Sequence, residues 1–283
     1  MKTGLVLEGG AMRGLFTAGV LDVLMENEIT FDGATGVSAG ACFGCNCKSG
    51  QNGRVIRYNL RFCRDKHYCS IWSLIFTGNM FGAEFCYHTI PDKLDLFDYK
   101  TFRENPMDFF VVCTDITTGK PVYKRLKTAC FTELEWMRAS ASMPLASKIV
   151  SIDGRKLLDG GISASIPLRF MEKNGYERNV VILTQPRGYI KKQGKSSSVI
   201  SAVYRKYPEF VKSCIQRPEM YNNQLRYIAQ AEKEGRAFVI APPEKLPIGH
   251  IEHNPDVMLE VYRTGRKTAL KSLKGLLKFR SLY

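Results

Sequence analysis

Two glycine-rich turns near the amino terminus carry the residues best suited to chemistry. The second turn reads Gly36-Val37-Ser38-Ala39-Gly40 and follows a short strand-like run. A G-x-S-x-G sequence between a strand and a helix permits a sharp backbone turn, which leaves the serine oxygen exposed at the head of the helix. The sequence therefore predicts Ser38 as a nucleophile.

The first turn supplies backbone donors beside that serine. Gly9, Gly10 and Ala11 directly follow an apolar run at residues 5–7. Backbone N–H groups in such a loop can converge on one point, as the oxyanion of an acyl-transfer reaction requires. We expect these three residues to form an oxyanion hole, and the two turns together predict a serine hydrolase.

Two aspartates farther along the chain are candidates for a catalytic carboxylate. Asp153-Gly154 separates strand-like stretches at 148–152 and 155–158, which is typical of a two-residue hairpin turn and accounts for Asp153 fully. Asp159 instead ends a strand and precedes two glycines, so its side chain can project from a tight loop.

The glycine loop, the serine elbow and the Asp159-Gly160-Gly161 element occur in this order in bacterial patatin-like phospholipases, which the chain resembles over about residues 3–185. That family consists of lipid acyl hydrolases with a Ser-Asp dyad, and the match selects Asp159 over Asp153. Its loop reads roughly G-G-G-x-[RK]-G. Ala11 replaces the third glycine here, and alanine has less conformational freedom.

The resemblance implies that Ser38 attacks the ester carbonyl of a lipid and forms an acyl-enzyme, which water then hydrolyses. Asp159 would accept the serine proton, with a pKa raised by burial beside the lipid. Arg13 matches the basic position of the family's loop and would either brace the loop or bind the substrate's phosphate head group. The resemblance implies no cofactor and no metal.

Other functions remain open. An acyltransferase would use the same serine with a different acceptor, and a non-catalytic lipid-binding protein would use only the pocket. A dinucleotide site is disfavoured because the loop reads G-G-A-M-R-G and the next strand leads to the serine elbow. A Ser-Asp-His triad would need one of four histidines, His67, His88, His250 or His253. The Ser…Asp…His chain order permits His250 or His253, although both lie in a loop-like stretch typical of surface residues.

The order of the expected elements indicates an α/β fold. Apolar runs at 3–8 and 29–36 are predicted strands, followed by helices at 12–27 and 38–49. This alternation predicts a parallel sheet with crossover helices. We expect a three-layer αβα, mainly parallel catalytic domain over residues 1–185. Further strands are expected at 109–113 and 180–184, and a further helix at 132–142.

Residues 186–283 form the second expected part, a basic and largely helical extension. They hold 19 Lys and Arg against 8 Asp and Glu, whereas residues 1–185 hold 22 against 19, so most of the net charge of +14 lies here. The expected elements are helices at 208–217, 219–235 and 256–279 and a strand at 237–241.

The last of these helices has an apolar stripe and a basic side. Its residues 263–280 favour peripheral contact with an anionic membrane, although the same stripe suits simple docking onto the catalytic domain. No nucleic-acid-binding motif occurs, so we expect no nucleic-acid partner. Residues 68–87 are rich in aromatic side chains and suit either a core helix or a mobile apolar flap over the site.

Composition places the chain among ordinary globular proteins, with 45% hydrophobic and 24% charged residues. No apolar run approaches the roughly 18 residues needed to span a bilayer. The nine cysteines lack the paired spacing of a disulfide framework. We expect Cys42, Cys45 and Cys47 to be buried or half-buried free thiols rather than metal ligands, and the location to be reducing and cytoplasmic.

Overall fold

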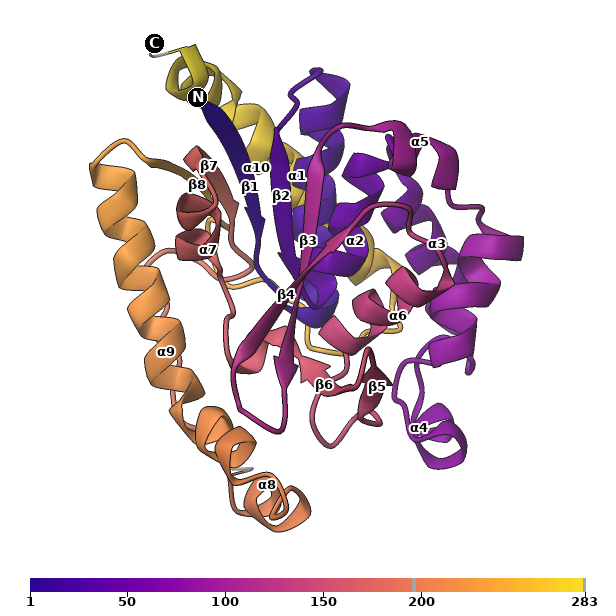
Figure 1. The fold of residues 1–283 in the computed structure, drawn as a ribbon. Helices are drawn as coiled ribbons and strands as arrows, with labels where there is room; N and C mark the ends of the chain where they lie inside the picture. Colours follow the sequence, from indigo (N-terminus) through magenta and orange to yellow (C-terminus); the bar gives the residue numbers. More distant parts are fainter. Residues whose placement is uncertain (195–196, 282–283) are drawn as a thin grey trace.

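The computed structural model describes residues 1–194 and 197–281, which build one eight-stranded sheet with helices on both faces (Figure 1). Seven strands follow the order β5-β6-β3-β2-β1-β7-β8, and β4 pairs with β3. The pairs β3–β2, β2–β1, β1–β7 and β7–β8 are parallel, whereas β4, β5 and β6 form an antiparallel part. The predicted α/β fold with a mainly parallel sheet is confirmed.

The elements have the following bounds. The strands are β1 (Lys2–Leu7), β2 (Gly33–Val37), β3 (Asp108–Asp115), β4 (Pro121–Leu126), β5 (Val150–Ile152), β6 (Arg155–Asp159), β7 (Tyr176–Ile182) and β8 (Ala237–Ile240). The α-helices are α1 (Gly14–Glu26), α2 (Ala39–Lys48), α3 (Arg54–Phe62), α4 (Ile71–Thr77), α5 (Tyr99–Glu104), α6 (Phe131–Ser140), α7 (Leu168–Lys173), α8 (Ser197–Val203), α9 (Pro208–Lys233) and α10 (Pro255–Ser281). Two 3₁₀ turns, η1 (Ala11–Arg13) and η3 (Gly160–Ile162), and a π-helix, η2 (Phe85–Leu94), complete them.

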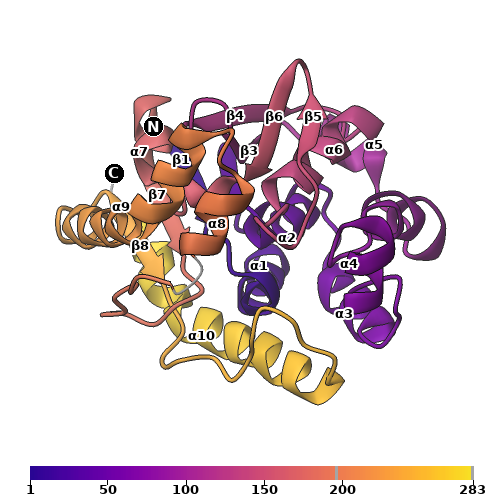
Figure 2. The same ribbon diagram turned by 90° about the horizontal axis from the view of Figure 1, so that it is seen from below.

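Alternate side chains of the central strands are buried in different layers. Leu5 and Leu7 of β1 belong to the core shared with α1, α2 and α10, whereas Val6 belongs to the core beneath α7 and α9. This is the two-residue period of a strand that is covered on both faces. Figure 2 shows α1 and α10 together on one side of the strands.

The segment after residue 185 is joined to this sheet. Strand β8 pairs with β7 in parallel, and α10 packs along α1. The two helices approach closely at glycines. A Cβ atom on Gly265 would lie 2.1 Å from the Phe16 carbonyl oxygen, and one on Gly19 would lie 2.1 Å from the Tyr262 carbonyl oxygen. The predicted domain division at residue 185 stays a prediction.

Gly265→Ala is expected to destabilise the protein by about 1–3 kcal/mol, because its methyl group would force α10 away from the backbone of α1. Urea unfolding followed by circular dichroism measures this change. Gly275→Ala in the same helix is the matched control. Its Cβ would lie 3.4 Å from the Phe238 ring, and we expect an unchanged or slightly higher stability. Equal effects of both substitutions would contradict the close helix crossing.

Two helical segments differ from the sequence-based expectation. Helix α9 continues through Pro218 instead of breaking there. A proline inside a helix removes one backbone hydrogen bond, but the side chains of Phe210, Tyr221 and Ile228 bury α9 on both sides of that point. Helix α4 is not a core helix, since Ile75 is 72% exposed.

Among the described residues, no helix combines the length and apolar character needed to cross a membrane.

Candidate active site

Ser38 lies on a sharp turn between β2 and α2. Its backbone has φ 55° and ψ −124°, a strained conformation for a residue other than glycine. The flanking glycines are required by close contacts, because a Cβ on Gly36 would lie 2.6 Å from the Ala41 backbone and one on Gly40 would lie 2.4 Å from the Leu7 carbonyl oxygen. The chain thus forms the sharp strand-to-helix turn that the G-x-S-x-G sequence predicts, and Ser38 is 8% exposed.

A second serine holds this turn in place. The Ser38 N–H donates to Ser140 Oγ at 2.9 Å, and Ser140 Oγ donates to the Val112 carbonyl oxygen at 2.6 Å. Ser140 therefore links the elbow to β3 and to the end of α6. Nothing in the sequence around Ser140 distinguishes it from the neighbouring small residues, so sequence reasoning missed it.

Asp159 ends β6 and is brought close to Ser38 by the pairing of β6 with β3 and of β3 with β2. Its carboxylate is nearly buried and accepts a hydrogen bond from the Gly161 N–H at 2.7 Å. Burial raises the pKa of Asp159, while Arg217, the Ser38 hydroxyl and the Gly161 N–H oppose that rise. The pKa is therefore set by burial against nearby donors and positive charge.

Asp153 lies elsewhere. It occupies the β5–β6 hairpin with φ 47°, and its half-exposed carboxylate pairs with Lys124 Nζ at 2.9 Å. The hydrogen bond from Lys124 lowers the pKa of Asp153. The turn role predicted for Asp153 is confirmed.

The loop at residues 9–11 presents free donors. Among the residues that the structure describes, no acceptor pairs with the N–H groups of Gly9, Gly10 or Ala11. Ala11 has φ 49°, so it adopts the left-handed conformation that favours glycine. Buried Glu8 supports the loop from behind by accepting hydrogen bonds from the Thr184 N–H and the Tyr221 hydroxyl, both at 2.6 Å.

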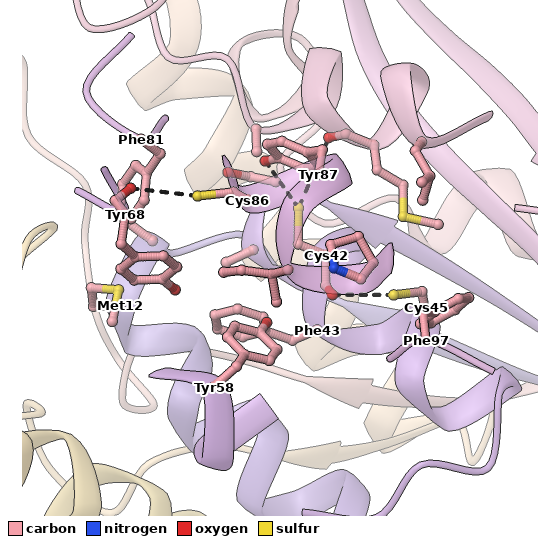
Figure 3. A pocket seen from close by; sticks show the side chains of 18 of the residues that line it. Met12, Cys42, Phe43, Cys45, Tyr58, Tyr68, Phe81, Cys86, Tyr87 and Phe97 are labelled. Atoms are coloured by element: carbon pink, nitrogen blue, oxygen red, sulfur yellow. Dashed lines mark hydrogen bonds between the residues drawn. The ribbon is translucent and has the colours of Figure 1, made fainter. Parts of the chain in front are cut away.

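An apolar cavity begins at Ser38 and runs behind α2. It encloses about 940 Å³ including its opening. Figure 3 shows side chains of α2, α3 and the segment around residues 68–87 directed into it, among them Cys42, Tyr58, Phe81 and Tyr87. Its lining is mostly aromatic and aliphatic, so it suits a hydrocarbon chain.

A polar cavity meets the apolar one at Ala11, Ser38 and Met143, which line both. Asp159 also lines it, together with cationic side chains from separate parts of the chain. These are Arg13, Lys191, Arg217 and the titratable His250. Sequence reasoning had proposed Arg13 but missed Lys191 and Arg217, because no motif surrounds either residue.

Three of the four histidines have partners away from Ser38. His67 Nδ1 lies 2.9 Å from Asp65, His88 Nε2 lies 3.2 Å from Glu135, and His253 Nδ1 lies 2.6 Å from the Cys63 carbonyl oxygen. His250 alone among them lines the polar cavity. Burial and the surrounding positive charges lower the pKa of His250.

The cysteines behind the elbow are free thiols. Cys42 and Cys47 are half-buried and Cys45 is buried, as the sequence predicts. Burial raises the pKa of Cys42 to about 11 and that of Cys45 to about 12, so neither carries a thiolate at neutral pH. Within residues 1–194 and 197–281, no three side chains form a metal-binding group.

The family model of the patatin-like phospholipases matches residues 5–171, which is more than half of the chain and includes the loop at residues 9–11, Ser38 and Asp159. The chain belongs to the patatin-like phospholipase family. A second model, a domain of unknown function (DUF6363), matches residues 207–281.

Relatives of this patatin-like chain include two curated proteins. It is 30% identical to the uncharacterized protein YjjU of Escherichia coli over 65% of its own length and 52% of that protein. It is 24% identical to lysophospholipase NTE1 of Cryptococcus neoformans over 95% of its length and 17% of that protein. The chain thus spans about half or less of these relatives. The structure of VipD from Legionella pneumophila superposes with a TM-score of 0.48 and 12% identity, covering 97% of this chain and 67% of that one.

Proposed function

We propose that the protein is a carboxylic-ester hydrolase that cleaves an acyl chain from a lipid through Ser38 and Asp159. One observation carries the proposal. Ser38 lies where an apolar cavity meets a polar one, beside a buried carboxylate and a loop with unpaired N–H groups. A lipid ester also has an apolar and a polar part, and its scissile carbonyl lies between the hydrocarbon chain and the polar headgroup.

The reaction follows from these positions. Asp159 removes the Ser38 proton as the serine oxygen attacks the ester carbonyl, and the N–H groups of Gly9, Gly10 and Ala11 stabilise the oxyanion. The amino-terminal end of α2 adds a favourable positive potential beneath the nucleophile. The alcohol leaves with the proton held by Asp159. Water then hydrolyses the acyl-enzyme by the same steps in reverse order.

The test is hydrolysis of a substrate panel by the full chain. Phospholipids, lysophospholipids, monoacylglycerols and short-chain esters, each with a labelled acyl group, are incubated with the protein and separated by chromatography. Release of free fatty acid equal to the ester consumed supports a hydrolase. Transfer of the label to a second lipid would instead support an acyltransferase, and no turnover of any ester would contradict both.

The exposed apolar residues of α4 support membrane contact at this site. Ile71, Ile75 and Phe76 are each at least two-thirds exposed. The segments on both sides of α4 reach the apolar cavity, because Tyr68 and Phe81 line it, and the Cys69–Phe81 β-bridge joins these two segments. We propose that α4 inserts into the lipid surface and places the cavity opening against it.

Replacing Ile75 and Phe76 together by serine is expected to lower the ratio of vesicle hydrolysis to short-chain-ester hydrolysis by at least about tenfold, because each buried apolar side chain contributes about 1.5–3 kcal/mol. The matched control replaces Leu270 and Leu277 of α10, both 54% exposed. Figure 1 shows the carboxy-terminal end of α10 beside the amino terminus, at the end of the molecule away from α4. A larger loss in the control would favour membrane contact through the basic helix α10 instead.

A further inference from the structure

The polar cavity beside Ser38 gathers cations from three distant segments. Arg13 belongs to the turn before α1, Lys191 follows β7, and Arg217 lies in α9. Only two carboxylates, Glu8 and Asp159, line the same cavity. The cavity therefore holds more positive than negative charge at neutral pH, with His250 also at its edge.

Neither carboxylate forms a direct ion pair with these cations in the described part of the chain. Glu8 already accepts hydrogen bonds from the Thr184 N–H and the Tyr221 hydroxyl. Asp159 accepts one from the Gly161 N–H and serves as the proposed base. No ion pair within the described residues joins either carboxylate to Arg13, Lys191 or Arg217.

The cations keep unused donors. Nε of Arg13 is buried without a partner among the described residues. Arg217 Nε donates to the Gly161 carbonyl oxygen at 2.7 Å, which fixes the guanidinium next to Asp159 and leaves its two terminal nitrogens without a described acceptor. Lys191 Nζ lies 4.8 Å from the centre of the Tyr221 ring, and its backbone N–H donates to Asn222 at 2.8 Å.

The burial of Lys191 and the positive charges around it act together on this side chain. Burial, together with Arg217 and Arg13, lowers the pKa of Lys191 to about 8. An anion bound between the three side chains would relieve this repulsion and accept their unused hydrogen bonds. Arginine forks and a lysine ammonium together match the several oxygens of a phosphate group.

We propose that Lys191 and Arg217, with Arg13, form a subsite for the phosphate of the substrate's headgroup, so that the enzyme selects phosphate-bearing lipid esters over neutral glycerides. This inference rests on the proposed function, because it assigns the headgroup end of the same substrate. It assigns a role in substrate specificity to Lys191 and Arg217, which lie outside the proposed catalytic elements.

The selectivity of the full chain tests this subsite. The measured quantity is the ratio of kcat/KM for a lysophosphatidate to kcat/KM for the monoacylglycerol with the same acyl chain. Lys191→Gln is expected to lower that ratio by about tenfold, since it removes a charge-assisted contact to the phosphate. The exposed neighbour Lys192 provides the matched control, and Lys192→Gln is expected to leave the ratio unchanged. Equal losses in both variants, or no loss in Lys191→Gln, would overturn the proposal.

A binding measurement separates this inference from the proposed function. Glycerol 3-phosphate and inorganic phosphate are titrated by calorimetry into the Ser38→Ala protein and into the same protein with Lys191→Gln added. Binding of glycerol 3-phosphate that weakens about tenfold with Lys191→Gln supports the subsite even if no ester is hydrolysed. Binding of both probes without any change in selectivity would show an ion site only and would overturn the headgroup assignment. Absence of binding and of selectivity would also overturn it.

Discussion

Ser38→Ala is expected to lower kcat/KM for lipid esters by about 10⁴-fold or more, because the acyl-enzyme cannot form without the serine oxygen. The fold should persist, since the bond that holds the elbow runs from the Ser38 N–H to Ser140 and does not involve the side chain that is removed. A fluorophosphonate probe measures the nucleophile directly. It should label the natural protein at Ser38 and fail to label the variant.

Ser151→Ala is the matched control for this experiment, because Ser151 is an exposed residue of β5. Its labelling and activity should equal those of the natural protein. Labelling that persists in Ser38→Ala, or hydrolysis within a factor of ten of the natural rate, would show that another residue is the nucleophile.

Asp159→Asn is expected to lower kcat by about 10³–10⁴-fold, since an amide cannot accept the Ser38 proton. The variant should be as stable as the natural protein or more stable at neutral pH. Burial raises the pKa of Asp159, so the charged carboxylate is less favourable in the folded state than in the unfolded one. That penalty is present above the ordinary pKa of an aspartate, and the neutral amide removes it. Thermal unfolding at pH 7 checks this expectation.

The control for this variant is Asp153→Asn, which changes the half-exposed aspartate of the β5–β6 hairpin. It should lose at most the weak ion pair with Lys124 and retain its activity. Near-natural hydrolysis by Asp159→Asn would instead assign the base to another group, with His250 in the polar cavity as the next candidate.

The pH dependence follows from the same carboxylate. The proposed base Asp159 can accept a proton only when it is ionised, so we expect kcat/KM to rise with pH through its pKa. Since burial raises that pKa, the acid limb should lie above the ordinary value of about 4. Arg217 opposes the rise, and Arg217→Gln should therefore move the acid limb to higher pH. A pH–rate profile with the limb unmoved would contradict this role of Arg217.

The serine elbow and the hairpin were predictable because their causes are local. A strand that turns sharply into a helix needs small residues around Ser38, and Asp153-Gly154 suits a two-residue turn whatever surrounds it. The alternation of strands and helices likewise indicated the parallel part of the sheet. The sequence also shows Ala11 where the resemblance predicts a third loop glycine, although only the structure shows that Ala11 adopts the left-handed conformation.

Other features depend on contacts that no local pattern encodes. The sequence predicts separate helices at 208–217 and 219–235, yet α9 continues through Pro218 because burial on both sides of it outweighs one lost hydrogen bond. The aromatic segment before η2 resembled a core helix, and only the packing shows that α4 leaves Ile75 and Phe76 exposed. Apolar side chains at helical spacing look the same in either case.

By itself the sequence determined the α/β fold class, the strained turn at Ser38 and the pairing of that turn with a glycine loop, because backbone geometry in short segments depends on the residues within them. Only the tertiary structure decided which distant side chains surround the serine. Ser140 supports the elbow, Glu8 anchors the loop, and Lys191 and Arg217 face the polar cavity across segments far apart in the chain. Their residue types are common and their neighbours uninformative, so their roles follow from proximity alone.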